Sequence, residues 1–158
     1  MNICLIYHSD TGNTKSFAEA IQNALEQKGH QVTNIQLQSL APIKKASVRE
    51  HQDISFRSLP KADDYDAILF GGPVWAFGPS PAIIAAIRQM TLKGKKCACF
   101  ATMGFPYHWM GGNGAIRYME RELGKKDALV LPGRICSRAT RDITALRKLR
   151  SLELISSL

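Results

Sequence analysis

Short apolar segments alternate with longer amphipathic segments along the chain. Four segments are continuous apolar runs, as expected for strands buried on both faces: residues 3–7, 67–70, 97–101 and 128–131. Between the first two of them, Thr33, Ile35 and Leu37 alternate with polar residues. That alternation predicts a half-exposed strand near an edge of the sheet. The pattern therefore predicts five strands.

Apolar residues recur at helical spacing between and after these strands. Gly29 follows the first helical segment, at a position suited to a helix C-cap. Strands that alternate with helices predict an α/β fold, with a parallel sheet and helices on both faces. We interpret residues 1–158 as a single domain of this kind. The residues that mark the helices are Phe17, Ala18, Ile21, Ala24 and Leu25; Ile83, Ile84, Ile87 and Met90; Ile116, Met119 and Leu123; and Ile143, Leu146 and Leu149.

Residues 39–61 are polar and irregular, and the pattern assigns them no element, although a short helix over residues 46–51 is one possibility. Three other segments follow predicted strands and carry candidate chemistry: residues 8–13, 71–79 and 102–114. In parallel α/β sheets, ligands bind at the carboxyl ends of the strands, near the switch in strand order. We therefore expect these three segments to form one site.

The first of these segments joins a buried strand to a helix N-terminus and is rich in hydroxyl groups. Backbone N–H groups and the helix dipole favour an anion there, and the glycine allows close approach. Residues 8–14 contain no lysine or arginine, which suits a phosphate monoester held by neutral donors. The P-loop and Gly-x-Gly-x-x-Gly patterns are absent from this segment. The candidate phosphate ligands are Ser9, Thr11, Gly12, Asn13 and Thr14.

This segment resembles the FMN-phosphate loop of flavodoxins, Ser/Thr-x-Thr-Gly-x-Thr, and the order of elements resembles that family along nearly the whole chain. The resemblance implies a flavodoxin-like three-layer sandwich, with a five-stranded parallel sheet in the order 2-1-3-4-5. It also implies FMN as cofactor, with its phosphate on residues 9 and 11–14. Asp10 falls at the variable position, and we expect its carboxylate to point to solvent.

Residues 65–75 resemble the flavodoxin segment that ends under the isoalloxazine ring. Trp75 and Phe77 can supply an aromatic wall by stacking, and Gly78 permits an unusual backbone shape. The alternative for Trp75 is a core tryptophan, but a loop flanked by prolines is rarely buried. The flavin-binding residues implied here are Pro73, Val74, Trp75, Ala76, Phe77 and Gly78.

The third segment is glycine-rich and aromatic. By the same resemblance, backbone N–H groups at its start face the pyrimidine edge of the flavin, and we include Thr102, Met103, Gly104 and Gly111 among the cofactor-binding residues. The aromatic part suggests a wall or lid for a flat substrate, or equally an interface in a homodimer. The residues of this wall are Tyr107, His108 and Trp109.

Charge and composition limit the classes of partner that we expect for this protein. Lysine and arginine number 21 and aspartate and glutamate 13, which gives a net charge of +8. This excess favours anionic partners, or simply supports solubility. No basic-aromatic nucleic-acid motif is present, so we expect no nucleic-acid partner. The four cysteines and four histidines lack metal spacing, so we expect free thiols and no metal. No apolar run is long enough for a membrane span, and without a signal-like N-terminus we expect a cytoplasmic protein.

The predicted function is redox chemistry on bound FMN. The flavin carries the reaction, so no catalytic side chain is required. Flavodoxin carriers are typically acidic, whereas this chain is basic, and positive charge favours the phosphates of NAD(P)H. We therefore favour an NAD(P)H-dependent oxidoreductase that passes a hydride to flavin N5 and then reduces quinones or similar flat acceptors. The alternatives are a one-electron carrier for a partner protein and a binding module that has lost FMN.

Overall fold

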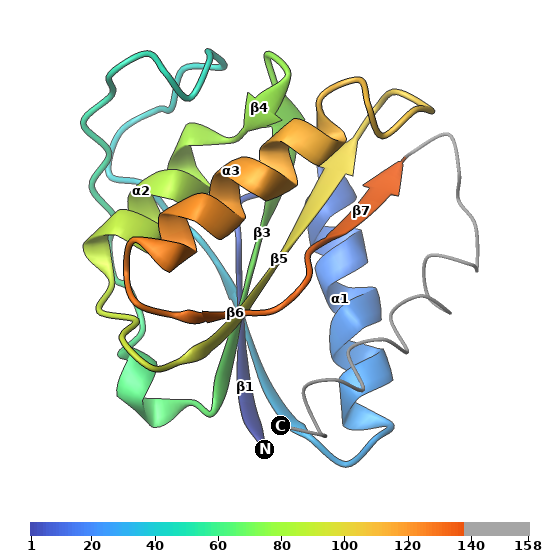
Figure 1. Ribbon diagram of the computed structural model, residues 1–158, viewed down its shortest axis with the longest axis vertical. Coiled ribbons are helices and arrows are strands. Elements are labelled where there is room, and N and C mark those ends of the chain that lie inside the picture. The colour runs from blue at the N-terminus through green and yellow to red at the C-terminus, as the bar shows by residue number, and fades with distance from the viewer. Residues whose placement is uncertain (138–158) are drawn as a thin grey trace.

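The apolar runs form the strands of a largely parallel sheet in the computed structural model, which describes residues 1–137 (Figure 1). The predicted helix that carries Ile143, Leu146 and Leu149 lies outside the described residues. The elements are β1 (Asn2–Tyr7), α1 (Asn13–Glu26), β2 (Gln31–Gln36), η1 (Ala62–Asp64), β3 (Ala67–Trp75), β4 (Gly78–Pro79), α2 (Pro81–Gln89), β5 (Lys96–Met103), α3 (Gly112–Gly124), β6 (Leu129–Val130) and β7 (Arg134–Ser137).

The order of the sheet is β2-β1-β3-β5-β6, and each neighbouring pair is parallel. β7 also pairs with β5, beyond β6 on the same edge, where Phe100 lies opposite Arg134. β6 and β7 together therefore occupy the fifth position. This arrangement confirms the predicted flavodoxin-like α/β fold and the strand order 2-1-3-4-5.

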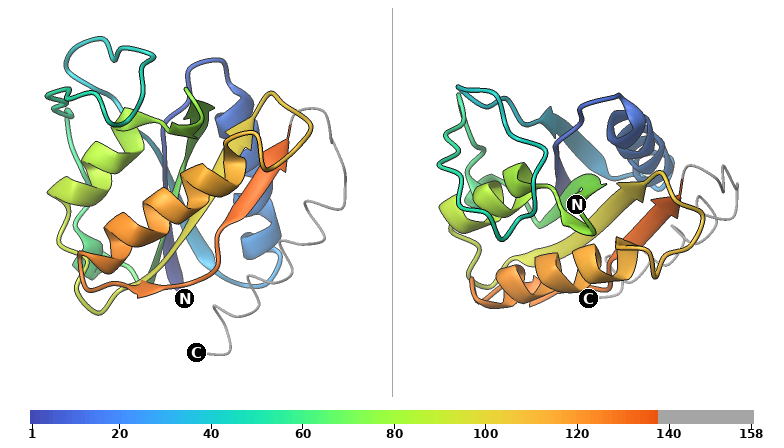
Figure 2. Two further views of the ribbon diagram at one scale, coloured as in Figure 1. Left: turned by 45° about the horizontal axis from the view of Figure 1, so that its top comes forward. Right: turned by 90° about the horizontal axis from the view of Figure 1, so that it is seen from above.

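Strand residues alternate between two apolar layers, one on each face of the sheet. Ile6, Phe70 and Cys99 pack with α2 and α3, whereas Leu5 and Leu69 pack with α1. Figure 2 shows the same division, with α1 on one side of the sheet and the other two helices on the opposite side. The described chain thus has helices on both faces, as the continuous apolar runs predict.

β3 is longer than predicted. Gly71, Gly72 and Pro73 suggested a strand end, but the strand continues to Trp75 and pairs with β5 through Pro73. The reason lies in packing, because a Cβ on Gly71 would lie 2.0 Å from the ring of Phe100. Gly71 therefore makes room for a large core side chain instead of ending the strand.

The fifth strand is also different from the prediction. Residues 128–131 supply only the two-residue β6, and β7 begins after an interruption at Pro132 and Gly133. Proline cannot donate to a strand ladder. A Cβ on Gly133 would lie 2.6 Å from Ile116 of α3, so the helix packs closely over the interruption. The interrupted strand bends here and resumes beside the end of β5.

Residues 39–61 form an irregular loop that is tied to itself. Ser39 and Phe56 form an antiparallel bridge, and the Gln52 side chain bonds the backbone N–H and carbonyl of Lys44. The helix considered for residues 46–51 is absent, and residues 48–50 form a turn. In Figure 2 this loop lies over the beginning of α2 and beside β4.

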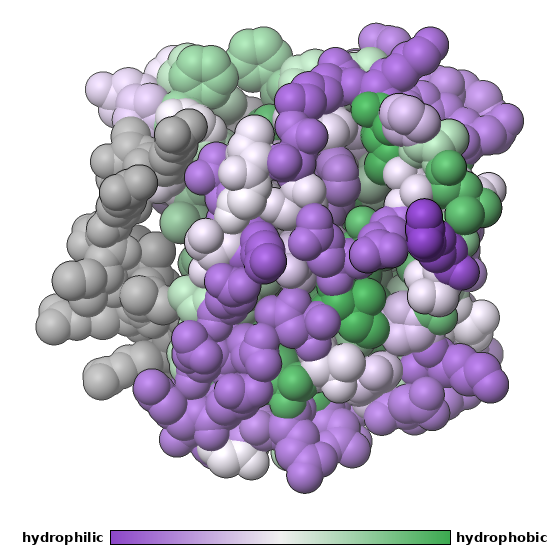
Figure 3. All heavy atoms as spheres, turned by 180° about the vertical axis from the view of Figure 1, so that it is seen from behind, coloured by the Kyte–Doolittle hydropathy of each residue, from purple (hydrophilic) through white to green (hydrophobic). Residues whose placement is uncertain are grey.

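The surface is mostly polar where the elements face solvent. Figure 3 shows a face that is largely hydrophilic, with hydrophobic residues in small separate areas. Within residues 1–137, no helix combines the length and apolar character that crossing a bilayer requires. The exposed aromatic side chains lie instead in the turn between β3 and β4 and in the segment after β5.

Candidate functional site

Three segments meet at the carboxyl edge of the sheet. We name them the first loop (residues 9–14), the hairpin (residues 74–79) and the third loop (residues 104–111). The hydroxyls of Thr14 and Thr102 lie 2.7 Å apart, which ties the first loop to the end of β5. A Cβ on Gly111 would lie 2.9 Å from Cα of Phe77, so the third loop ends against the hairpin. The structure therefore brings the three predicted segments together.

The first loop leads into the N-terminus of α1 and carries hydrogen-bond donors. Gly12 is the N-cap of α1 with φ of 88° and, as a glycine, offers no side chain to cap the helix. The Lys15 N–H donates to the Ser9 hydroxyl at 3.3 Å, and the Asn13 amide donates to Thr11 at 2.9 Å. The first N–H groups of a helix have no intrahelical acceptor, so this end of α1 suits an anion.

Thr14 differs from the other hydroxyl residues of the first loop because it is buried. It is 2% exposed, and Thr102 is 6% exposed. A hydroxyl has one proton and two acceptor positions. This contact uses only one of the two hydroxyl protons, so the other is left for a further acceptor. The pair also links the first loop to the end of β5.

Lys45 reaches this site from residues 39–61, which the sequence analysis did not connect with it. Its ammonium group pairs with the Asp10 carboxylate and lies 5.7 Å from the centroid of the Trp75 ring. Asp10 is exposed, as expected, but its charge is neutralised by this partner. No local signal could identify Lys45, because it is far from the first loop along the chain.

The hairpin has an unusual backbone. Ala76 and Phe77 form a two-residue turn with φ of 46° and 62°. Such turns normally contain Asn or Gly, because most other residues disfavour positive φ. The turn leaves Phe77 69% exposed and Trp75 half-buried. Trp75 is thus neither a core tryptophan nor a fully exposed one. Backbone strain in such a turn is typical of functional sites.

His8 lies between the first loop and the hairpin. Its Nδ1 is 2.7 Å from the Ser80 hydroxyl, which also accepts the Ala82 N–H and so caps α2. Its ring contacts Trp75 edge-to-face at 5.1 Å between centroids. Burial lowers the pKa of His8, the Asp10 carboxylate opposes this shift, and Lys45 adds to it. His8 therefore favours the neutral form.

The stability of the protein should depend on the protonation of His8. Because the pKa is lowered from 6.5 in the folded state, the stabilisation is complete above pH 6.5 and is lost as the pH falls through the folded pKa. We expect His8→Asn to reduce the pH dependence of urea unfolding between about pH 5 and 7. His30 has a lowered pKa too, so the comparison is made in a His30→Asn background. Identical pH profiles with and without His8 would contradict this assignment.

The third loop presents its aromatic side chains to solvent. Phe105, Tyr107 and Trp109 are 51%, 59% and 74% exposed, and the last two stack at 5.8 Å between ring centroids. The His108 carbonyl accepts the Asn113 N–H, and the residue is exposed. The predicted wall residues therefore lie together at the rim, whereas Met103 at the end of β5 is buried.

Three buried thiols lie away from these segments, whereas the thiol of Cys136 is carried by β7 beside Thr102. Cys4, Cys97 and Cys99 are free and buried, and burial raises the pKa of Cys4 and of Cys97 to about 12. Within residues 1–137, no group of three or more potential ligand side chains is placed to hold a metal ion. The described site thus offers hydroxyl, amide and aromatic groups, together with one lysine.

Comparison with solved structures shows the same fold. Flavodoxin 1 from Bacillus cereus is 21% identical, with a TM-score of 0.69 over 100% of this chain and 99% of that chain. A flavoprotein from Bacteroides eggerthii is 24% identical, with a TM-score of 0.70 over 98% of each chain. A flavoprotein from Lactobacillus acidophilus, solved in complex with FMN, is 18% identical, with a TM-score of 0.65 over 94% and 98%.

A protein-family comparison gives the assignment. The family described as NADPH-dependent FMN reductase matches residues 1–123. The matched range contains the first loop, the hairpin, the third loop and nearly all of α3. The chain therefore belongs to the NADPH-dependent FMN reductase family, as an FMN-binding flavoprotein with a flavodoxin-like fold.

Proposed function

We propose that the three segments hold FMN, and that the protein uses it to transfer electrons from NAD(P)H to small flat acceptors such as quinones. The observation that carries this proposal is the stacked, exposed pair Tyr107 and Trp109 beside segments suited to phosphate and flavin. Bound FMN supplies the redox chemistry, and the protein supplies position, electrostatics and access.

The first loop fits the FMN phosphate. The N-terminus of α1 offers backbone N–H groups, and Gly12 adopts the left-handed conformation that exposes them. Ser9, Thr11 and Asn13 add neutral donors, and the Thr14–Thr102 pair leaves one hydroxyl proton for a further acceptor. A phosphate monoester suits such a neutral cradle, because hydrogen bonds to an anion are strong without a charged partner.

The hairpin and the end of β5 fit the flavin ring. We assign the aromatic wall to Trp75 and Phe77, and the contacts with the pyrimidine edge to backbone groups of residues 102–104 and 111. Backbone donors there stabilise negative charge on the ring. The ammonium group of Lys45 lies over the Trp75 ring and is balanced by the Asp10 carboxylate, so this pair adds no net charge near the wall.

Anaerobic spectroscopy tests the proposed electron donor. The FMN-loaded protein should lose its visible flavin absorption within seconds of adding stoichiometric NADPH or NADH. A carrier for a partner protein would keep its flavin band under the same conditions. No flavin band after loading with FMN and removing the excess would contradict both redox functions.

The aromatic residues of the third loop should determine affinity for the acceptor. Replacing Trp109 with alanine removes one stacking surface, so we expect KM for a benzoquinone to rise about threefold to tenfold. The rate of flavin reduction by NAD(P)H should stay the same. Leu129→Ala removes a 55% exposed side chain on β6 and serves as the matched control. If these residues instead join two copies of the chain, Trp109→Ala would lower the sedimentation coefficient and leave KM unchanged.

A further inference from the structure

A second cleft lies along the outer face of α2 and takes no part in the site described above. Its volume is about 540 Å³, and residues 48–55 form the wall opposite the helix. Most of its lining is polar, and its floor is the apolar part, formed by Pro81, Ile84 and Ala85. This size is typical of pockets for organic ligands.

The cleft begins beside the hairpin. Val48, which lines the cleft, lies 3.5 Å from the position that a Cβ on Gly78 would occupy. From there the cleft follows α2 to Arg88 and Tyr118. A helix rises about 1.5 Å per residue, so the distance from Pro81 to Arg88 is roughly 10 Å. A ligand in this cleft would therefore extend away from the proposed flavin wall.

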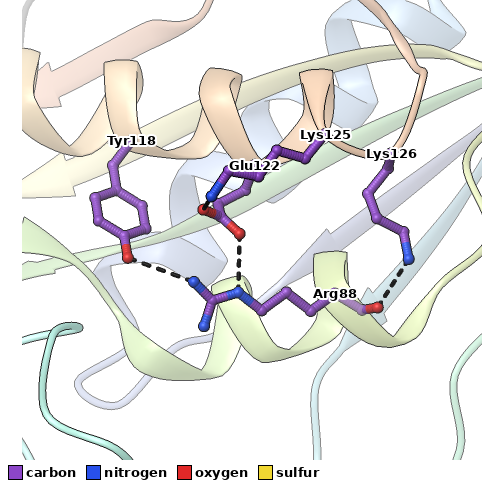
Figure 4. A network of polar contacts seen from close by, with 5 residues as sticks. All are labelled: Arg88, Tyr118, Glu122, Lys125 and Lys126. Atoms are coloured by element: carbon purple, nitrogen blue, oxygen red, sulfur yellow. Dashed lines mark hydrogen bonds and ion pairs between the residues drawn. The ribbon is translucent and has the colours of Figure 1, made fainter.

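The far end of the cleft carries a cationic network (Figure 4). Arg88 Nε donates to Glu122 at 2.8 Å, and Nη2 lies 3.5 Å from the Tyr118 hydroxyl. The other terminal nitrogen points away from both partners (Figure 4), and the Arg88 side chain is 53% exposed. The guanidinium group is thus held in one orientation while keeping donors available.

Positive charge exceeds negative charge in this network. The Glu122 carboxylate is 4% exposed and also accepts Lys125 at 2.7 Å. The hydrogen bond from Arg88, followed by that from Lys125, lowers the pKa of Glu122, so it stays ionised. Lys126 donates to the Arg88 carbonyl at 2.9 Å. Two cations therefore share one carboxylate, and a third, Lys126, is held beside them by the Arg88 carbonyl.

Acidic groups also line the cleft, on the opposite wall. Glu50 and Asp53 both lie in residues 48–55 and are exposed. Asp53 is 96% exposed and pairs with His51 at 3.1 Å. Gln89, next to Arg88, donates to the Ile54 carbonyl at 2.7 Å, so Asp53 lies near the same end of the cleft as Arg88. An anion at this end would therefore depend on the oriented guanidinium group of Arg88.

We propose that this cleft binds the adenosine half of NADPH, with the 2′-phosphate on Arg88 and the nicotinamide end directed toward the hairpin. This inference rests on the proposed use of NAD(P)H as electron donor. The apolar floor suits the adenosine, and an arginine with free donors suits a phosphate. NADPH and NADH differ only in the 2′-phosphate, so Arg88 determines the preference between them.

Steady-state kinetics of the FMN-loaded protein test the role of Arg88. For Arg88→Gln, we expect kcat/KM for NADPH to fall about tenfold or more, because a charged hydrogen bond to phosphate is lost. The value for NADH should change less than about twofold. Arg117→Gln removes an exposed arginine elsewhere on α3 and is the matched control for net charge. Equal losses with both nucleotides would overturn the proposal.

Calorimetry with adenosine 2′,5′-bisphosphate tests the cleft without turnover. The FMN-loaded wild type should bind this probe more tightly than adenosine 5′-monophosphate. Ala85→Trp fills the cleft and keeps every charged group of the network. It should weaken binding of the probe by about tenfold or more, as should Arg88→Gln. Thermal melting of each variant confirms that it is folded. Unchanged affinity in both variants would overturn the proposal.

The two proposals fail in different ways. If NADPH and NADH reduce the flavin but neither variant changes nucleotide preference or probe binding, the cleft assignment is wrong and the proposed function stands. If neither nucleotide reduces the flavin but binding of the probe still depends on Arg88 and Ala85, the anion site stands and the assignment of NAD(P)H as electron donor is wrong.

Discussion

Replacing Thr14 with valine is expected to weaken FMN binding by about tenfold to a hundredfold, while riboflavin affinity stays the same. Thr14 is the second residue of α1, and its buried hydroxyl is oriented by Thr102 at 2.7 Å. Losing one hydrogen bond to a charged phosphate costs roughly 1.5–3 kcal/mol. Riboflavin has the same ring but no phosphate, so it isolates this contact.

Fluorescence titration of the apoprotein with each flavin measures the effect. Thr33→Val replaces an exposed threonine on β2 and should change neither affinity. Thr102→Val should cause a smaller loss of FMN affinity, because Thr102 acts through the orientation of Thr14. If Thr14→Val weakens riboflavin binding as much as FMN binding, then Thr14 supports the ring or the fold, and its assignment to the phosphate is wrong.

Local chemistry explains why much of the site could be predicted. The first loop carries its donors within six consecutive residues, and its place between a buried strand and a helix is visible in the apolar pattern. The topology of a parallel sheet then brings the other two segments to the same edge. Nothing beyond strand order was needed to bring residues 9–14 and residue 102 together, and the Thr14–Thr102 contact confirms that proximity.

The contacts that could not be predicted are those made over long distances by irregular segments. Lys45 pairs with Asp10 because residues 39–61 fold back on themselves through the Ser39–Phe56 bridge and Gln52. No periodic pattern encodes such a loop. The cleft along α2 depends on the same loop, so its apolar floor appeared in the sequence only as an ordinary amphipathic helix.

Errors in strand limits have a common physical cause. Glycine and proline usually end strands, and the predicted strand limits rest on this local preference. Tertiary packing decides the conformation of these residues instead. Gly133 lies directly beneath Ile116, where no larger residue fits, and the strand resumes as β7. β7 has only four residues, and it is too short and too polar to be recognised as a strand from the sequence.

Gly71 offers the clearest test of this explanation. Replacing it with alanine is expected to destabilise the protein by about 2–4 kcal/mol, because the new Cβ would lie 2.0–2.6 Å from three atoms of the Phe100 ring. The ring cannot move freely, since it is buried and packs edge-to-face on Phe17 at 5.6 Å. Urea unfolding of the apoprotein measures the change.

Gly72→Ala is a matched control in the same strand. A Cβ there would lie 3.5 Å from Ser80 and Ile83, which is ordinary van der Waals contact, so we expect a change within about 1 kcal/mol. Replacing the ring with a smaller side chain tests the mechanism further. Gly71→Ala combined with Phe100→Leu should destabilise the protein less than the two single changes added together. If Gly71→Ala and Gly72→Ala destabilise equally, backbone flexibility and not space for Phe100 explains the glycines. In that case, the flexibility of the two glycines, and not the space that the Phe100 ring needs, explains why the strand continues through them.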